Sequence, residues 1–182
     1  MFSDPVKNLK FFGLRDNSIV ADLGAGTGFY SIAAGQMVPH GKVYAVEIVK
    51  DFLTTIKHKA EDAHLKNVET LWGNIEDKGG THIADGVVDA VIASNTLFQV
   101  EDKNQFIEEI KRILKPGGRV LFIDWTKGDP ADEGKESPFF NFKGVMPKDQ
   151  AEELFKRRGF AVEREIDAGL HHYGMKIGRA HV

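Results

Sequence analysis

The 182-residue sequence predicts an α/β fold: a doubly wound, mostly parallel sheet with helices on both faces and an antiparallel strand pair at its C-terminal end. Short apolar runs alternate with helical patterns over residues 18–125, as in parallel sheets with helical crossovers. A glycine-rich turn joins the first apolar run to the helix that follows it. The last two apolar runs, 160–166 and 172–177, are joined too tightly for a crossover, so they should pair antiparallel.

Each element has its own signal. Asp4 can cap a first helix over residues 5–12, with proline in its first turn and Gly13 after its end. Further strands are expected at 18–23, 42–47, 67–72, 87–93 and 119–125. Helices are expected at 29–38, 50–64, from about 106 to the turn at Pro116-Gly117-Gly118, and from Pro147 to near Gly159. The glycine-rich stretch 77–85 suggests a short helix, and 126–146 has no period and should be a long loop.

Composition limits the function. The length suits one domain over residues 1–182, and the absence of cysteine excludes disulfides, thiolate metal sites and a cysteine nucleophile. The net charge of −3 does not favour nucleic acid. No apolar run reaches the length of a membrane span and residues 1–5 do not resemble a signal peptide, so we expect a cytoplasmic protein without membrane insertion. The scattered histidines predict no metal site.

The turn over residues 24–28 is the most informative segment. It follows a buried strand and precedes a helix, an arrangement that predicts a site for a small anionic or zwitterionic ligand. The spacing is Gly24-x-Gly26-x-Gly28, and Phe29 stands where a dinucleotide-binding loop has its third glycine. A phenylalanine there should crowd the helix against the sheet, which disfavours NAD.

Two acids accompany this turn. Glu47 ends the strand 42–47, at about the distance from the glycines at which a carboxylate meets a ribose. Asp22 lies inside an apolar strand, where an unpaired charge is costly. Asp22 therefore needs a partner, either N–H groups of the loop or a cation of the ligand.

Five segments together resemble successive motifs of class I S-adenosylmethionine-dependent methyltransferases: 22–28, Glu47, 73–77, 89–95 and 114–120. The most similar branch contains small-molecule and quinone-biosynthesis methyltransferases. The resemblance spans roughly residues 19–125, and residues 154–160 show a weaker similarity to the same family. It implies a Rossmann-like fold, S-adenosylmethionine as the cofactor and a single methyltransferase domain.

The resemblance also implies roles for the residues that bind the cofactor. The loop of Gly24, Ala25, Gly26 and Gly28 would pass around its methionine and ribose portion. Asp22 would face the methionine ammonium, and the backbone carbonyl of Ser94 would lie near the same amine.

The adenosine half of the cofactor would be held by the ends of the next two strands. Glu47 would hold the ribose hydroxyls, with Ile48 against the adenine face, and Asn74 and Ile75 would meet the adenine edge. The family usually has aspartate where this chain has Asn74, so binding there lacks the assistance of a charge.

The methyl acceptor is expected to be a small molecule, and no catalytic residue is assigned. Asn95, Thr96, Phe98 and Gln99 should face the pocket, where many relatives have a histidine that this chain lacks. Residues 1–17 and the loop 126–146 would form a thin cover on the acceptor side, which leaves a large acceptor or closure by a partner chain, such as a homodimer, open. Trp125, Phe139, Phe140 and Phe142 would line the acceptor pocket or fix the loop to the core.

Two other functions remain open from the sequence. One is an NAD-type oxidoreductase, which Phe29 disfavours. The other is a non-catalytic S-adenosylmethionine-binding subunit that activates a partner methyltransferase, an alternative that the missing histidine keeps open.

Overall fold

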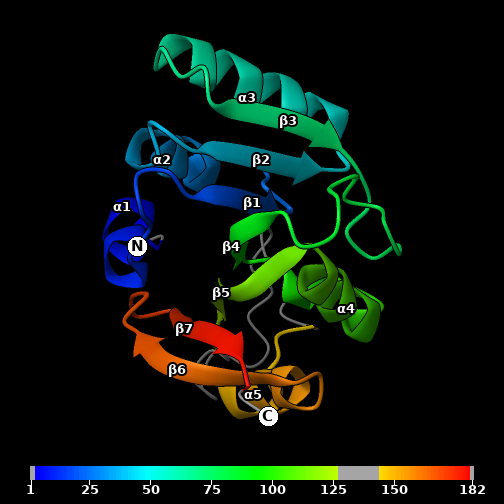
Figure 1. Cartoon of the computed structure of the whole chain (residues 1–182). Helices are drawn as coiled ribbons and strands as arrows, with labels where there is room; N and C mark the ends of the chain where they lie inside the picture. Colours follow the sequence, from blue (N-terminus) through cyan, green and yellow to red (C-terminus); the bar gives the residue numbers. More distant parts are fainter. Residues whose placement is uncertain (1–2, 127–143, 181–182) are drawn as a thin grey trace, which may run out of the picture.

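The computed structural model describes residues 3–126 and 144–180, which form one seven-stranded sheet in the order β3-β2-β1-β4-β5-β7-β6 (Figure 1). Strands β1 to β5 pair in parallel, and β7 pairs antiparallel with both β5 and β6. The predicted fold class is therefore confirmed. Because the strand order reverses between β1 and β4, the topological switch point lies beside the end of β1.

The elements have the following bounds. The strands are β1 Ile19–Leu23, β2 Lys42–Glu47, β3 Val68–Trp72, β4 Val88–Ser94, β5 Leu114–Trp125, β6 Phe160–Ile166 and β7 His172–Arg179. The α-helices are α1 Pro5–Phe12, α2 Phe29–Met37, α3 Lys50–Asp62, α4 Lys103–Ile113 and α5 Lys148–Lys156, and Leu97–Gln99 forms the short 3-10 helix η1. Within the described residues, no helix is long and apolar enough to cross a membrane.

Helix α1 has the ends that the sequence predicts. The Asp4 carboxylate accepts a hydrogen bond from the Lys7 N–H (3.1 Å), and Gly13 ends the helix in the left-handed region with φ +84°. These caps satisfy backbone groups that the helix itself leaves free. The helix therefore has a fixed start and end before β1 begins.

Two expected elements differ in the structure. Leu114, expected on the apolar stripe of a helix, instead starts β5 and pairs with Val88, and the register shifts before Ala90 pairs with Arg119. The Pro116-Gly117-Gly118 segment therefore forms an irregularity within β5 rather than a turn before it. Gly117 has φ +78°, a conformation that glycine adopts without strain.

The stretch 77–85 forms turns, not the short helix that the sequence suggested. The buried carboxylate of Glu109 on α4 accepts hydrogen bonds from the N–H groups of Gly79 (2.9 Å) and Thr81 (3.3 Å) and from the Thr81 hydroxyl (2.7 Å). A distant side chain thus satisfies backbone donors that a helix would have paired internally. Most of the expected loop 126–146, with Phe139, Phe140 and Phe142, lies outside the described residues.

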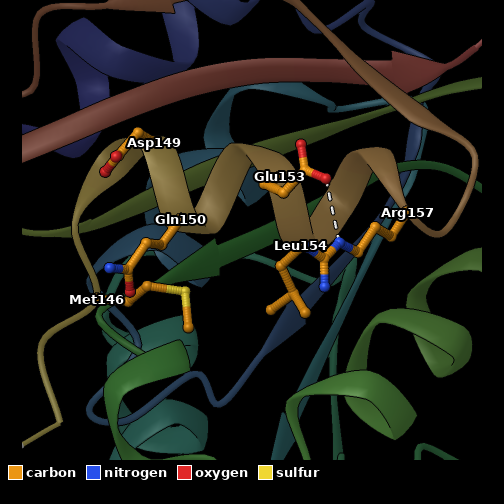
Figure 2. A pocket seen from close by; sticks show the side chains of 6 residues that line it. All are labelled: Met146, Asp149, Gln150, Glu153, Leu154 and Arg157. Atoms are coloured by element: carbon orange, nitrogen blue, oxygen red, sulfur yellow. Dashed lines mark hydrogen bonds and ion pairs between the residues drawn. The ribbon is translucent and has the colours of Figure 1, made fainter.

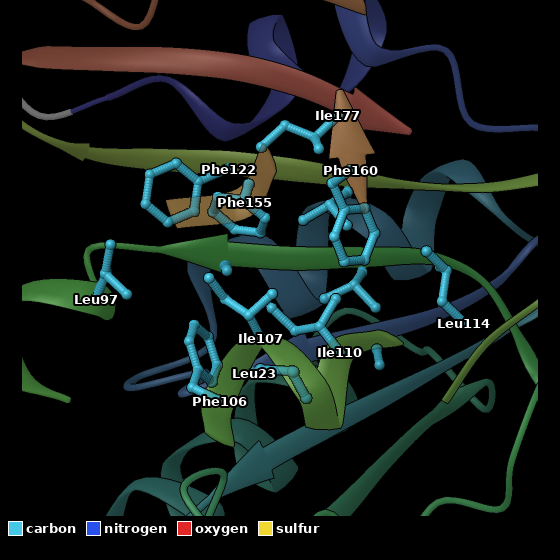
Figure 3. Close-up of a cluster of buried hydrophobic side chains, with 14 of the residues drawn as sticks. Leu23, Leu97, Phe106, Ile107, Ile110, Leu114, Phe122, Phe155, Phe160 and Ile177 are labelled. Carbon is cyan, nitrogen blue, oxygen red and sulfur yellow. The ribbon is translucent and has the colours of Figure 1, made fainter. Parts of the chain in front are cut away.

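Apolar side chains cover both faces of the sheet. On one face, a cluster joins the sheet to α4 and α5 (Figure 3), and Phe155 lies edge-on to Phe122 at 5.1 Å and to Phe160 at 5.8 Å between ring centroids. On the other face, a second cluster joins the sheet to α1 and α2. The strands are thereby held as a rigid platform, and ligands have access at their carboxyl ends.

Glu109 provides a test of how the turns over residues 77–85 are held. Burial by itself raises its pKa, but hydrogen bonds from Arg112, Gly79 and Thr81 outweigh burial and hold the pKa at about 2. We predict that Glu109→Gln lowers the free energy of unfolding at neutral pH by about 3 kcal/mol, since it leaves the largely buried Arg112 with only the exposed Asp85 as a carboxylate partner. Denaturant unfolding measures this difference.

The pH dependence has a definite sign. An unperturbed glutamate titrates near 4.5, so the contribution of Glu109 is complete above this pH and is lost as the pH falls toward 2. The gap between the wild type and the variant should therefore close over this range. Glu108→Gln is the control, because Glu108 forms a half-exposed ion pair with Arg158 that should contribute less than about 1 kcal/mol. Equal losses in both variants would contradict the assignment.

Candidate functional site

The glycine loop lies at the carboxyl end of β1 and leads directly into α2. Gly28 caps α2 with φ +88°, and a Cβ atom placed on it would come within 2.8 Å of Ile56 Cγ1 on α3. Both the backbone conformation and the close approach of α3 therefore exclude a side chain at this position. Gly28 is the point at which the loop, α2 and α3 meet.

Phe29 does not crowd the helix against the sheet, contrary to the expectation from the sequence. Its side chain is 69% exposed, and the Lys59 ammonium lies over its ring at 4.2 Å from the centroid. Residue 29 points outward because it begins α2 on the solvent side, and Gly28 takes the position of close packing. The steric argument against a dinucleotide at Phe29 was therefore wrong, although the glycine spacing still differs from a dinucleotide loop.

Glu47 connects three segments at the end of β2. Its buried carboxylate accepts hydrogen bonds from the N–H groups of Gly26 (2.9 Å), Ile48 (2.9 Å) and Val49 (3.0 Å). Gly26 belongs to the glycine loop, whereas the other two donors lead into α3. This carboxylate therefore fixes the shape of the loop as well as lying at the site.

Asp22 is buried in β1 at only 2% exposure, and its partner is neither a loop N–H group nor a ligand but the side chain of Ser31. The Ser31 hydroxyl in the first turn of α2 donates to Asp22 Oδ2 at 2.6 Å. Burial raises the pKa of Asp22 to about 7; the Ser31 hydroxyl opposes this rise, and the negative charge of Glu47 adds to it. The backbone of Ser31 donates to Asp22 as well, yet these hydrogen bonds do not compensate the buried charge, so the position favours a cation nearby.

A pocket of about 300 Å³ lies across the ends of β1, β2 and β3 and the segment that follows β4. It brings together six of the residues that the sequence assigned to the cofactor: Gly24, Gly26, Glu47, Ile48, Asn74 and Ile75. Four others do not line it: Asp22, Ala25, Gly28 and Ser94. The nucleoside half of the predicted set is thus assembled around one opening.

Other lining residues were not assigned to the cofactor: Val46, Val49, Phe52, Gly73, Glu76, Thr96, Gln99 and Val100. Thr96 and Gln99 had been considered only as acceptor-side residues. Phe52 in the first turn of α3 is 37% exposed. Its place in the first turn after β2 was the available signal, because such turns lie at the carboxyl edge of the sheet.

Asn74 already uses its side chain within the loop after β3. Its Oδ1 accepts a hydrogen bond from the Glu76 N–H at 3.1 Å, which makes a turn. The Glu76 carboxylate in turn accepts from the N–H groups of Glu101 and Asp102 just before α4. The residues expected at an adenine edge are therefore anchored to the start of α4.

The turn after β4 is shaped by Asn95 and Thr96. Asn95 has φ +54°, a left-handed conformation that asparagine tolerates, which favours a structural role in the turn. The Thr96 hydroxyl lies 3.0 Å from the carbonyl of Ser94 and 3.2 Å from that of Leu23, so it links the ends of β4 and β1. The Ser94 carbonyl, which was expected near an amine of the ligand, thus has a partner within the chain.

Asp124 at the end of β5 is an acid near the pocket that was not predicted from the sequence. It is fully buried, its Oδ1 accepts from the Trp125 N–H at 2.8 Å, and the backbone of Phe98 donates to it as well. Burial raises the pKa of Asp124 to about 6 despite these hydrogen bonds. Because Phe98 lies in η1, between lining residues of the pocket, Asp124 helps to position that wall.

A second hollow lies on the surface of α5 (Figure 2). Its charged side chains stand on one helix, and Glu153 forms an i, i+4 ion pair with Arg157 at 3.1 Å. The nearby Met146 accepts a hydrogen bond at its backbone carbonyl from the Tyr173 hydroxyl. No buried polar group points into this hollow from the described residues, so the chemistry is better placed at the carboxyl edge.

The sequence is similar to those of known methyltransferases. A family model described as a methyltransferase domain matches residues 14–159. A demethylmenaquinone methyltransferase of Bacillus mycoides is 29% identical over 143 residues, which are 78% of this chain and 58% of that protein. An arsenite methyltransferase of Aquipseudomonas alcaligenes is 29% identical over 163 residues, which are 85% of this chain and 47% of that protein. The chain thus spans about half the length of these curated relatives.

Two solved structures of methyltransferases are also similar to this chain. The crystal structure of a SAM-dependent methyltransferase from Aquifex aeolicus has a TM-score of 0.83 at 29% identity, with 97% of this chain and 89% of that chain covered. A structure from Sulfolobus solfataricus, described as a putative type 11 methyltransferase, has a TM-score of 0.68 at 28% identity, with 90% and 85% covered. With the family model matching most of its length, this chain belongs to the methyltransferase domain family.

Proposed function

We propose that this protein transfers a methyl group from S-adenosylmethionine to a small-molecule acceptor. One observation supports the proposal above all: two buried carboxylates, Asp22 and Glu47, flank a glycine loop at the switch point of the sheet. S-adenosylmethionine carries an ammonium and a sulfonium at one end and ribose hydroxyls next to them. Asp22 has no cation beside it among the residues that the structure describes, and Glu47 is a second acid beside the loop. The two acids match this distribution of charge and hydroxyl groups.

In this proposal Asp22 binds the methionine ammonium, close to the Ser94 carbonyl. Gly24, Ala25, Gly26 and Gly28 allow the backbone to approach the methionine and ribose portion closely. Oε1 of Glu47 accepts from the N–H groups of Ile48 and Val49, whereas Oε2 accepts only from that of Gly26. Oε2 therefore keeps a lone pair to which a ribose hydroxyl can donate without opening the loop.

The adenine lies between Ile48 and the segment after β3. Ile48 is 52% exposed at the edge of the pocket, which is unusual for a large apolar side chain and suits contact with a flat base. Asn74 Oδ1 keeps a second lone pair for the adenine amino group, and Ile75 provides backbone groups at the adenine edge.

The chemical step needs little from the protein beyond positioning. The sulfonium is an activated donor, and the methyl group moves in line to a nucleophilic atom of the acceptor while S-adenosylhomocysteine leaves. The chain contributes alignment of the two reactants and exclusion of water. We assign no general base, because the Thr96 hydroxyl is engaged at the carbonyls of Ser94 and Leu23 and the amide of Asn95 is not basic.

The names of the relatives suggest two kinds of small acceptor. A quinone-derived acceptor fits this chain better than arsenite, since the sequence contains no cysteine and thiolates are the favoured ligands of soft metal and metalloid centres. Family membership disfavours an NAD-type oxidoreductase, and a non-catalytic subunit stays the second candidate. A cytoplasmic location, a homodimer and the absence of nucleic acid among the partners stay predictions.

Ligand-dependent stability tests the proposed donor. A ligand that binds only the native state raises the melting temperature, so S-adenosylhomocysteine and S-adenosylmethionine should each raise it and NAD should not. Radiolabelled methyl transfer to a panel that contains a reduced demethylnaphthoquinone and arsenite then tests catalysis. Stabilisation by NAD alone would overturn the proposal, and binding without transfer to any member of the panel would favour the non-catalytic subunit.

Glu47→Gln should weaken binding of S-adenosylhomocysteine by ~1.5–3 kcal/mol, the scale of a hydrogen bond to a charged group. Isothermal titration calorimetry measures the dissociation constant. Glu69→Gln is the matched control, because Glu69 is an exposed acid on the neighbouring strand β3 that pairs with Lys42. An unchanged dissociation constant in Glu47→Gln, with the melting temperature retained, would remove Glu47 from the ribose site.

The raised pKa of Asp22 predicts that binding of the cofactor releases a proton from its carboxyl group. Its carboxyl is largely protonated below its raised pKa of about 7, whereas a bound ammonium stabilises the carboxylate and lowers that pKa. Binding of S-adenosylhomocysteine at a pH of about 6 should therefore release close to one proton, and affinity should rise with pH until it levels off above about 8. Calorimetry in buffers of different ionisation enthalpy counts the protons.

Asp22→Asn is the control for this linkage, since it keeps the shape and removes the titrating group. It should abolish proton release and flatten the dependence of affinity on pH. Proton release that persists in Asp22→Asn would assign it to another group.

A further inference from the structure

A row of side chains follows the carboxyl edge of the sheet on the face covered by α1 and α2. Residues paired across strands share a face, and the register pairs Asp22 with Ile92, Ile92 with Leu121, Ser94 with Ile123, and Trp125 with His172. Because side chains alternate along a strand, this places four residues on that one face at neighbouring strand ends: Asp22, Ser94, Trp125 and His172. The row starts at the proposed methionine end of the cofactor and leads away from it.

Polar side chains of α1 and α2 lie at the Asp22 and Ser94 end of this row. The Tyr30 hydroxyl on α2 lies within hydrogen-bond reach of the Ser94 side chain and is close enough to Asp22 to feel its charge. It also accepts from Asn8 Nδ2 (2.9 Å), which lies on α1. The Oδ1 atom of Asn8 is buried without a hydrogen-bond partner. Helix α1 thus brings a second set of polar groups to the same edge.

His172 is the unexplained group in this row. The residue is 5% exposed, and neither ring nitrogen has a hydrogen-bond partner. Its ring lies on Trp125 with centroids 4.1 Å apart and an interplanar angle of 36°. Burial lowers its pKa to about 4, with the neighbouring His171 as a smaller cause, so the imidazole is neutral and offers one donor and one acceptor. A buried polar group without partners is costly and calls for a ligand.

We infer that His172 binds the methyl acceptor by a hydrogen bond from its imidazole, with Trp125 and His172 forming a flat wall against a planar, uncharged acceptor that carries a hydroxyl or carbonyl group. This inference rests on the proposed function, since it takes the methyl donor to lie at Asp22. His172 starts β7 and was not among the acceptor-side residues that the sequence predicted, whereas Trp125 was.

The charges along this edge agree with an uncharged acceptor. The row contains the acid Asp22 and the neutral His172. Among the described residues on this face, the ammonium of Lys176 is held by the carbonyl of Phe12 (2.8 Å) and that of Lys7 by Asp167 (3.2 Å). Because these cations are already engaged, a polyanionic acceptor would have no ready counter-charge.

Phenol is a suitable probe, because it has one hydroxyl on one flat ring. The protein is saturated with S-adenosylhomocysteine, and phenol is titrated while the ring C–H signals of the histidines are followed by two-dimensional NMR. We expect a saturable shift of the His172 signals and none at the exposed His171. No shift at His172, or equal shifts at both histidines, would overturn the inference.

Two variants make the test independent of folding. His172→Phe keeps a flat ring against Trp125 but removes both nitrogens, and it should weaken phenol binding roughly three- to tenfold, as expected for one hydrogen bond. His171→Phe, its exposed neighbour, should bind phenol like the wild type. Equal phenol affinity in His172→Phe would overturn the inference.

The affinity for S-adenosylhomocysteine is measured in the same samples and should be unchanged in both variants. Failure of the wild type to bind S-adenosylhomocysteine would count against the proposed function itself. Phenol binding that is lost together with S-adenosylhomocysteine binding in His172→Phe would assign His172 to the structure of the donor site and overturn the inference.

Discussion

The carboxylate of Glu47 is the interaction on which the geometry of this edge depends. It accepts from three backbone N–H groups that belong to two different connections, one after β1 and one after β2. Glycine-rich loops have no side chains to hold their shape, so an acceptor from a neighbouring strand must do so. The same residue that organises the loop also lines the pocket. Organisation of the loop and recognition of a hydroxyl-bearing ligand are therefore linked in one side chain.

Asp22, unlike Glu47, is a carboxylate that the chain leaves incompletely compensated. Glu47 satisfies its charge with three backbone N–H groups, whereas Asp22 has hydrogen bonds from Ser31 alone and an elevated pKa. The two acids also repel, since the charge of Glu47 contributes to the rise in the pKa of Asp22. A ligand with a positive charge near Asp22 and neutral hydroxyls near Glu47 compensates the buried charge of Asp22 and adds no negative charge beside Glu47. The chain thus carries an electrostatic asymmetry along the loop, which gives a zwitterionic ligand a direction.

Much of the fold and about half of the candidate site could be predicted from the sequence. The strand and helix pattern yielded the sheet, because alternating short apolar runs and helical stripes admit few arrangements, and the caps of α1 could be located from Asp4 and Gly13. Six proposed cofactor residues meet at one pocket because the carboxyl ends of parallel strands share an edge. The errors have physical causes. Leu114 fits a helical stripe and a buried strand equally well, and the Glu109 carboxylate replaces a local helix through contacts about 30 residues away in the sequence.

The acceptor side was harder to predict for a reason that lies in the sheet itself. In the parallel part, the segment after each strand meets the site, so searching those segments finds the donor residues. The last strand runs the other way, and its first residues, not its last, stand at this edge. His172 therefore reaches the site from the start of β7, and its face is set by a register that pairs it with Trp125. A shift of one residue would turn His172 to the face of α4 and α5, where Tyr173 now lies. Since no local pattern in residues 167–173 fixes that register, the position of the imidazole becomes visible only once the pairing of β5 with β7 is known.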